Sequence, residues 1–386
     1  MPECLPPSEQ AIIEQFQHFI ESELMILASQ YSAQANPSIL TTIRQRSQTL
    51  GFYRRTQPLE FGGIQTSPLL MTALTETLYA ANLPFNREVF GPGPGILANA
   101  SDEIKNRYLT PVLNGDMRVA FAFTEPSDGA AHTQAEIDGD MLVINGQKSY
   151  VTGGENADIL TVFVHMPHSP AATPPSTGSQ SIPSAMVIIP TTAKGVSQQA
   201  RFNSLDGSHH AAFKFEQVRI PKTDMIGAIG EGMGRALSNI ARLRLTVSAQ
   251  AAGLCQWTLN YLADQLNFRQ RNGKSLAERD SVKLRYADLR IQVYAARAML
   301  YRTARLVDKE AECLNEVSAT KVLVCELLNQ VVDQAVQLVG GQALVESHPL
   351  AILYKRVRAY RLIEGASDVL RLNIAKNHLQ QGQGRL

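Results

Sequence analysis

The sequence predicts an α+β protein in which a β-rich domain lies between two helical domains. Three observations lead to this fold class. Apolar residues recur at three- and four-residue spacing near the N-terminus, short β-type runs follow, and the helical spacing then returns for the rest of the chain. Because two helical blocks that flank an insertion must bury their apolar faces, we expect them to pack together as one bundle.

The first domain is predicted over residues 1–117. The runs IIEQFQHFIESELMIL and SPLLMTALTETLYAANL have the apolar spacing of amphipathic helices. Proline and glycine cluster in PLEFGG and FGPGPG, so these two segments are predicted loops between helices.

The second domain is predicted over residues 118–228. It contains the runs VAFAF, MLVING, ILTVFVH, SAMVIIP and AAFKFEQVRI, separated by glycine, proline, serine or asparagine. Short runs of this kind are typical of strands, so we expect a β-sandwich or barrel. The stretch HSPAATPPSTGSQSIPS has almost no apolar side chains and is a predicted solvated hairpin loop.

The third domain is predicted over residues 229–386. Long amphipathic segments fill it, and they are broken near Asn272-Gly273 and at Gly340-Gly341. We therefore expect a helical bundle with turns at these two places.

Charge and composition exclude several classes of protein. Lysine and arginine total 36 against 35 acidic residues, which does not favour a nucleic-acid or membrane-surface partner. The four cysteines lack metal-ligand spacing, and we expect no metal and a reducing compartment. The N-terminus lacks a signal-peptide pattern and no window looks apolar enough to span a bilayer, so a cytoplasmic location is expected. The adjacent His209 and His210 are predicted surface residues.

A lone carboxylate stands out in RLIEGASDVLRLN. Glu364 follows two apolar residues and precedes glycine and other small residues. One interpretation is that it caps the following helix, because an acid near a helix start is favoured by the helix dipole. The other is that it is a catalytic base, for which apolar neighbours are suitable because desolvation raises basicity.

Four segments, in the same order along the chain, resemble the acyl-CoA dehydrogenase family of flavoproteins. They are DEIKNRYLTPVLNGDMRVAFAFTEPSDG, INGQKSYVTGGENADI, FNSLDGSHHAAFKFEQVRIPKTDMIG and QLVGGQALVESHPLAILYKRVRAYRLIEGASDVLRLNIAKNHL. The resemblance covers nearly the whole chain. It implies an N-terminal helical domain, a middle β-sandwich or barrel domain, a C-terminal four-helix bundle, and FAD as cofactor.

The resemblance also implies a role for Glu364. In many members a glutamate at this place removes a proton from the carbon next to an acyl thioester, while the neighbouring carbon gives a hydride to flavin N5. Some relatives carry the base on the first long helix of the C-terminal block, where this chain has Leu243. Arg244 matches an arginine near the base in many members, and the alternative for it is a cation on a helix surface.

The cofactor-binding residues are likewise implied by the resemblance. Strand and turn positions near the flavin ring and pyrophosphate are Phe121, Phe123, Thr124, Gly129, Ala130, Tyr150 and Thr152, and positions near the catalytic segment are Ala366 and Asp368. A second subunit would contribute Arg269, Gln337 and Gly341, which implies a homodimer or homotetramer, and Asn272 is a further cofactor-binding position in the pattern.

The chain departs from the family pattern at several of these positions. Where the family usually has Gly-Ser-Asp, this chain has glycine followed by Ala130 and Ala131. The usual phenylalanine, tryptophan and threonine of the family are replaced here by Asn272, Tyr150 and Ala366, respectively. A lost hydrogen bond costs on the order of 1 kcal/mol, so several such losses weaken cofactor binding unless they are replaced.

The expected function is FAD-dependent dehydrogenation of an acyl thioester, carried by coenzyme A or by an acyl carrier protein. Electrons would pass to an electron-transfer flavoprotein or to oxygen. The basic run YKRVRAYR is either a solvated helix face or a surface that accepts cofactor phosphates or an acidic carrier protein. Two alternatives are a flavin-dependent monooxygenase on the same fold and a relative that has lost flavin and catalysis.

Overall fold

The structure is a computed structural model, and it describes residues 5–31, 37–126, 132–167, 182–268, 270–271, 273–309 and 311–382. The chain forms two compact units. The first comprises Met1–Thr56, Gly63–Gly91 and Ala241–Leu386, and the second comprises Gln57–Gly62 and Pro92–Ile240. The first unit therefore contains helices from both ends of the chain, and its limits are not those of the three-domain division.

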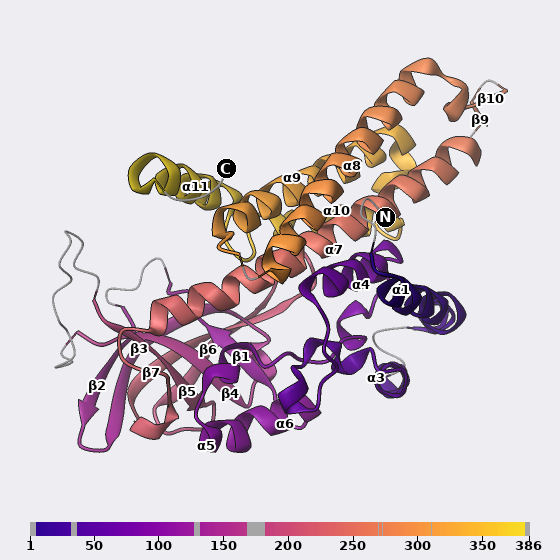
Figure 1. Cartoon of the computed structure of the whole chain (residues 1–386). Helices are drawn as coiled ribbons and strands as arrows, with labels where there is room; N and C mark the ends of the chain where they lie inside the picture. Colours follow the sequence, from indigo (N-terminus) through magenta and orange to yellow (C-terminus); the bar gives the residue numbers. More distant parts are fainter. Residues whose placement is uncertain are drawn as a thin grey trace. The chain divides into compact units, whose positions relative to one another are not determined.

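The first unit is helical (Figure 1). The described helices from the N-terminal part are α1 (Pro7–Phe19), α2 (Met25–Gln30), α3 (Pro37–Thr49) and α4 (Pro68–Ala80), with a π-helical turn (Ile20–Leu24) joining α1 to α2. Those from the C-terminal part are α7 (Gly232–Phe268, which begins in the second unit), α8 (Asp280–Asp308), α9 (Leu314–Val339), α10 (Pro349–Val357) and α11 (Ser367–Gln381). The predicted breaks lie between α7 and α8 and directly after α9.

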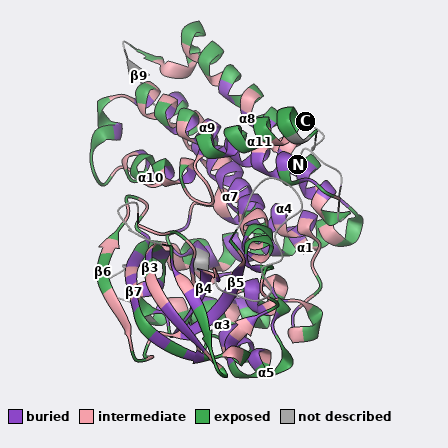
Figure 2. Cartoon of the chain, turned by 90° about the vertical axis from the view of Figure 1, so that its left-hand side faces the viewer, coloured by how far each residue is buried: buried purple, intermediate pink, exposed green. Residues whose placement is uncertain are grey.

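Local sequence explains where these helices begin and how closely they pack. The Ser67 hydroxyl accepts a hydrogen bond from the Leu70 N–H and so caps α4, and Pro68 occupies its first turn. A Cβ on Gly253 would lie 2.3 Å from the Glu76 carbonyl oxygen, so only glycine allows α7 to approach α4 this closely. Figure 2 shows the buried faces of these helices turned toward a shared interior.

A buried ion pair joins α4 to α8 within this interior. Arg297 Nε lies 2.6 Å from Glu76 Oε1, and the Tyr301 hydroxyl donates to Glu76 Oε2 at 2.6 Å. Glu76 is 2% exposed and Tyr301 is fully buried. Burial raises the pKa of the Tyr301 hydroxyl, and it therefore stays a donor to the carboxylate.

Helix α9 corrects one expectation from the sequence. An 18-residue window of α9 has a mean hydropathy of 1.3, which is apolar and long enough to cross a membrane, although no such window was expected. Half of that window is buried inside the protein, and the buried residues of α9 include Glu316, Ser318 and Lys321. These features identify α9 as a core helix of the bundle, because a core helix passes the same test of length and composition.

The second unit contains a mixed sheet, preceded by α5 (Asp102–Ile104) and α6 (Thr110–Asn114), which a π-helical segment (Lys105–Leu109) joins. Its strands are β1 (Val119–Ala122), β2 (Gln134–Asp138), β3 (Met141–Thr152), β4 (Ile159–His165), β5 (Ser184–Pro190), β6 (Val196–Asn203), β7 (His209–Pro221) and β8 (Met225–Ile226). They follow the order β6-β7-β3-β2-β4-β5-β8, and β1 pairs with β4 in parallel. A separate hairpin, β9 (Gln270–Arg271) with β10 (Lys274–Ser275), belongs to the first unit.

Strands β4 and β5 are buried on both faces. Leu160 and Val162 belong to an apolar cluster shared with β3 and β7, whereas Ile159 and Phe163 belong to a cluster shared with the helical segments before β1. Because strands at both ends of the sheet contribute to the first cluster, the sheet curls around it. This agrees with the predicted sandwich or barrel. Residues 168–181 of the predicted hairpin loop lie outside the described residues.

Candidate functional site

In the first unit, Glu364 lies in the turn between a 3-10 turn (Arg358–Arg361) and α11. Glu364 has a φ of 53° and Gly365 a φ of 103°, so two successive residues adopt a left-handed backbone. A non-glycine residue in this region costs on the order of 1–2 kcal/mol. The surroundings must therefore hold the turn in place, and strain of this kind is common at active sites.

Arg244 on α7 contacts this turn directly. Its Nε donates a hydrogen bond to the Glu364 carbonyl oxygen at 2.9 Å, and its Nη1 donates to the Ser318 hydroxyl of α9 at 3.3 Å. The side chain is only 8% exposed, so the alternative of a surface cation is wrong. A Cβ at Gly365 would lie 3.4 Å from Arg244 Nη2 and 3.0 Å from Leu370 Cδ2, which shows how closely the arginine packs on the turn.

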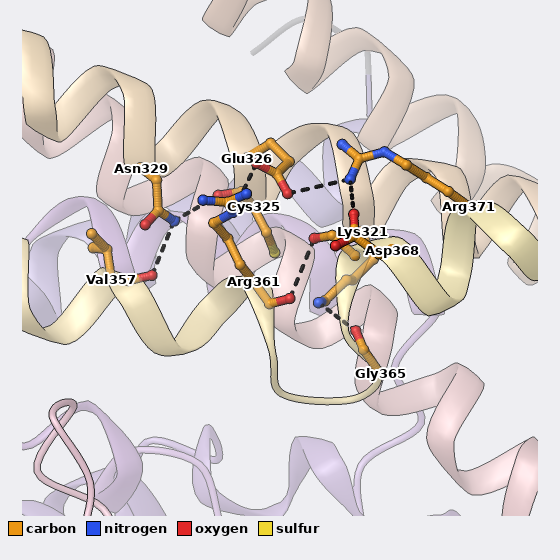
Figure 3. A network of polar contacts seen from close by, with 10 residues as sticks. Lys321, Cys325, Glu326, Asn329, Val357, Arg361, Gly365, Asp368 and Arg371 are labelled. Atoms are coloured by element: carbon orange, nitrogen blue, oxygen red, sulfur yellow. Dashed lines mark hydrogen bonds and ion pairs between the residues drawn. The ribbon is translucent and has the colours of Figure 1, made fainter.

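Lys321 on α9 contacts the next residue of the turn. Its Nζ donates a hydrogen bond to the Gly365 carbonyl oxygen at 2.9 Å (Figure 3), and the side chain is 0% exposed. Sequence reasoning missed this residue. Its signal was a single cation inside the apolar run VSATKVLVCELL, the same kind of signal that singled out Glu364.

The Glu364 side chain makes no hydrogen bond and no ion pair with any residue that the structure describes. Burial raises the pKa of its carboxyl, although the charges of Arg244 and Lys321 act in the opposite direction. The cap of α11 is Ala366, and no side chain caps the helix, so the helix-cap interpretation of Glu364 is wrong. Leu243, at the alternative position for a base, is an apolar, partly buried residue of α7.

The basic run before the turn is mostly paired inside the unit. Arg361 forms an ion pair with Glu326 at 2.8 Å, and Arg371 lies 3.6 Å from the same carboxylate (Figure 3). Arg356 donates a hydrogen bond to the Asn82 side chain. Lys355 pairs with the exposed Glu346. The run is therefore a partly paired helix surface, and only part of its charge remains for a ligand.

In the second unit, an irregularity in β3 displays Tyr150. The register of β3 with β7 shifts between Lys148 and Val151, so the residues between them bulge from the ladder. Tyr150 has a φ of 54° and is 63% exposed. Its ring meets Phe202 edge to face at 5.3 Å. Residues held in a strained backbone conformation cluster at functional sites, which makes Tyr150 a candidate for contact with a ligand.

The aromatic residues on and after β1 form a stack. The Phe121 and Phe123 rings lie 5.8 Å apart, and Phe123 contacts Phe163 of β4 at 5.2 Å. Both Phe121 and Phe123 are half-buried. Thr124 is exposed, and its carbonyl oxygen accepts a hydrogen bond from the Ser149 N–H at 2.8 Å, which places it beside the bulge that carries Tyr150.

A hydrogen-bonded chain leads from Thr152 into the protein. The Thr152 hydroxyl lies 3.2 Å from His210 Nδ1, and the Ser208 hydroxyl lies 2.8 Å from His210 Nε2. Asp206 accepts the Ser208 hydroxyl at 2.6 Å. His210 is 8% exposed, so its prediction as a surface residue is wrong, while the neighbouring His209 is exposed. The strand alternation separates the two histidines and turns His210 toward Thr152.

Glu125, in the segment after β1, is hydrogen-bonded to several residues. Lys148, which is 1% exposed, donates to Glu125 Oε1 at 3.0 Å, and His132 Nδ1 lies 2.7 Å from Oε2. His165 lies beside them, and its Nδ1 is buried without a hydrogen-bond partner among the described residues. Glu125, His132 and His165 thus place three potential metal-ligand atoms within 4.8 Å of one another. The sequence did not indicate this cluster. A buried ammonium beside the carboxylate disfavours a cation there, so we interpret the group as an ion-pair network.

The remaining predicted residues are spread over other places. Gln337 and Gly341 are exposed at the C-terminal end of α9 and the turn after it. Asp368 is exposed in the first turn of α11 and pairs with Arg371 at 3.0 Å. Residues Gly129, Ala130, Arg269 and Asn272 lie outside the described residues.

The chain is similar to known proteins over most of its length. Residues 6–116 match the family description "Acyl-CoA dehydrogenase, N-terminal domain", and residues 230–379 match "Acyl-CoA dehydrogenase, C-terminal domain". The chain is 28% identical to the short-chain specific acyl-CoA dehydrogenase of Homo sapiens, covering 97% of this chain and 91% of that protein. It is also 28% identical to a 3-(aryl)acrylate reductase of Clostridium sporogenes, covering 86% of this chain and 88% of that protein.

A solved structure shares the fold. The structure of a putative acyl-CoA dehydrogenase from Mycobacterium abscessus superimposes with a TM-score of 0.83 at 23% identity, and the match covers 99% of this chain and all of that chain. The predicted fold, with a β domain between an N-terminal and a C-terminal helical domain, is therefore confirmed.

Proposed function

The chain belongs to the acyl-CoA dehydrogenase family, and from this premise we propose that it oxidises an acyl thioester between its α and β carbons with FAD as the hydride acceptor. The observation that carries the proposal is the turn of Glu364. It presents a carboxylate without a partner among the described residues, and the strained backbone beneath it is hydrogen-bonded to two buried cations.

Glu364 is the base in this proposal. An α-proton of a thioester is weakly acidic, so its removal needs a carboxylate whose basicity is raised and whose position is fixed. Burial raises the pKa of Glu364, and the hydrogen bonds from Arg244 and Lys321 to the turn fix its backbone. The proton moves from the α carbon to the Glu364 carboxylate, the β carbon loses a hydride, and the carbon–carbon double bond forms between them.

The second unit contains residues that fit an isoalloxazine ring. Tyr150, Phe121 and Phe123 supply aromatic surface, and Thr124 and Thr152 supply exposed hydroxyl groups beside it. When bound, FAD supplies a two-electron acceptor for the hydride. The protein's own contribution there is to fix the position of the Thr152 side chain through its contact with His210.

The carrier of the acyl group and the final electron acceptor are part of the proposal. We propose coenzyme A as the first carrier to test, because a relative of 28% identity is named as an acyl-CoA dehydrogenase. An acyl carrier protein is the second, because the exposed Arg358 remains on the basic run. Electron-transfer flavoprotein and oxygen are the two acceptors that we propose to compare. The acrylate reductase among the relatives makes the reverse reaction a further arm of the test.

We also propose that the protein is a homodimer or homotetramer in the cytoplasm. Support for association comes from apolar side chains on the outer face of α8, where Leu284, Ile291 and Tyr294 are each at least 65% exposed. Leu372 and Leu379 of α11 are 70% and 81% exposed. Exposed apolar stripes on helices mark interfaces. Sedimentation of wild type and of Ile291→Glu tests this, and a monomeric wild type would contradict it.

The experiment for the catalytic proposal is a visible absorption spectrum of the purified protein under anaerobic conditions. The protein is mixed in turn with butyryl-CoA, octanoyl-CoA, 3-phenylpropanoyl-CoA and the same acyl groups on an acyl carrier protein. Loss of the oxidised flavin band with one of them supports a dehydrogenase and identifies the carrier. A yellow protein that none of them reduces favours the monooxygenase alternative, and a protein that does not bind added FAD would overturn the proposal.

A further inference from the structure

Lys321 is a lysine without solvent contact in the core of the first unit. It lies in the N-terminal half of α9, is 0% exposed, and uses its ammonium to donate to the Gly365 carbonyl at 2.9 Å. Burying an ammonium group is costly unless opposite charge and hydrogen bonds compensate it. A neutral polar residue, or an apolar one, would satisfy helix packing here at lower cost. The charge therefore needs an explanation beyond packing.

Charged and titratable groups approach Lys321 from each neighbouring element. Arg244 faces it from α7, Cys325 and Glu326 from α9 itself, and Glu364 from the turn. Burial raises the pKa of the Cys325 thiol to about 12, so this group stays neutral at physiological pH. Glu326 is already engaged by Arg361 and Arg371 (Figure 3). Glu364 is thus the carboxylate near Lys321 that has no ion pair among the described residues.

The hydrogen bond of Lys321 acts on the backbone that carries Glu364. Arg244 holds the Glu364 carbonyl and Lys321 holds the Gly365 carbonyl, so consecutive peptide groups are hydrogen-bonded to cations on two different helices. Hydrogen bonds from charged donors are stronger than those between neutral groups. The Ser367 hydroxyl adds a weaker contact to the Arg361 carbonyl at 3.3 Å. Without the cations, the left-handed conformation at Glu364 would lose its main support.

We propose that Lys321 is a positioning residue for the reaction of Glu364, holding the strained turn through the Gly365 carbonyl and placing a positive charge beside the base. This inference rests on the proposed function. The positive charge favours ionised Glu364 and opposes the effect of burial. Lys321 does not contact the reacting atoms in this account and acts only through the turn and its charge.

The test compares Lys321→Met, Lys321→Gln and Lys321→Arg in the flavin-loaded enzyme. The rate of flavin reduction is measured in single turnovers across a pH series, using the thioester that reduces wild type fastest. Lys321→Met removes both charge and donor, Lys321→Gln keeps a donor without charge, and Lys321→Arg keeps both. Lys283→Met on the exposed surface of α8 is the control for removing a lysine. Melting temperature and flavin content are recorded for each.

We expect Lys321→Met to lower the maximal reduction rate at least about tenfold and to shift the apparent pKa of reduction upward. Lys321→Gln should shift the apparent pKa in the same direction with a smaller loss of rate, and Lys321→Arg should restore the wild-type pKa. A purely structural lysine would change melting temperature and flavin content but not the apparent pKa. If Lys321→Met does not fold, the same question is decided by comparing the apparent pKa of reduction in Lys321→Gln and in Lys321→Arg.

An unchanged apparent pKa and rate per bound flavin in folded Lys321→Met or Lys321→Gln would overturn the inference. This failure is distinguishable from failure of the proposed function. If Lys321 has no role but Glu364 is the base, wild type is reduced and Glu364→Gln is not. If the proposed function is wrong, wild type itself is not reduced by any thioester, and the inference on Lys321 falls with it.

Discussion

Arg244 and Lys321 donate hydrogen bonds to consecutive carbonyl groups, with Arg244 Nε 2.9 Å from the Glu364 oxygen and Lys321 Nζ 2.9 Å from the Gly365 oxygen. The two cations come from helices that are far apart in the sequence. They bind the main chain and leave the Glu364 carboxylate without a hydrogen bond among the described residues. A carboxylate on a fixed backbone, with no partner of its own, is the arrangement that a general base requires.

The free carboxylate should cost the protein stability. Burial raises the pKa of Glu364 in the folded state above its ordinary value of 4.5, so the folded protein binds this proton more tightly than the unfolded chain. The linkage relation then predicts that stability falls as pH rises from the unfolded pKa through the folded one. Glu364→Gln removes this penalty. The variant should melt close to wild type at about pH 4 and above it at about pH 7. Equal differences at both pH values would contradict the assignment.

Glu125 should have the opposite effect: its contribution to stability should increase as pH rises. Burial alone would raise its pKa, but hydrogen bonds from His132, the Thr133 N–H and Lys148 lower it to about 2. Its contribution is present above the unfolded pKa of 4.5 and is lost as pH falls toward 2. Glu125→Gln should therefore reduce stability at neutral pH and weaken the acid dependence in that window.

The buried Lys148 provides the control for Glu125. Glu125→Gln leaves its ammonium without a counter-charge, and we expect a loss of about 2 kcal/mol, less than for a fully buried pair because Glu125 is partly exposed. The double variant Glu125→Gln with Lys148→Met removes both charges and should recover most of the loss. Urea denaturation measures each. Additive losses would show that the two groups do not depend on one another.

The buried ion pair between Glu76 of α4 and Arg297 of α8 should contribute more to the free energy of unfolding than an exposed ion pair does. Glu76→Ala leaves a largely buried guanidinium and a buried tyrosine hydroxyl without their acceptor, so we expect a loss of about 3–5 kcal/mol in the free energy of unfolding. Glu346→Ala removes an exposed partner of Lys355 and should cost less than about 1 kcal/mol. Similar losses in both variants would mean that burial does not set the strength of these pairs.

The fold could be predicted from the sequence where the pattern is local. The apolar runs ILTVFVH and SAMVIIP became the doubly buried strands β4 and β5, and the breaks at Asn272-Gly273 and Gly340-Gly341 separate the long helices. These predictions held because periodicity, glycine and proline act over a few residues. The limits of the compact units depend on packing between distant helices, which a local pattern does not record.

The site could be predicted only in part, for the same reason. Glu364 was visible as a charge among apolar and small residues, but the partner of Lys321 is a carbonyl 44 positions further along the chain. A lysine on a helix is ordinarily read as exposed. His209 and His210 were both predicted at the surface, but they begin strand β7, and strand alternation exposes His209 and buries His210. Charges inside apolar runs are therefore the positions to examine for partners.

The most direct test of Glu364 as the base compares the anaerobic reduction of bound flavin in wild type and in Glu364→Gln. Each protein is mixed with a thioester that reduces wild type, and reduction is measured as the loss of oxidised-flavin absorbance. Glutamine keeps the shape of the side chain and removes the base. We expect the variant to bind flavin and thioester as wild type does and to be reduced more slowly by about three orders of magnitude or more. Reduction of Glu364→Gln at the wild-type rate would remove Glu364 from the mechanism and contradict the account.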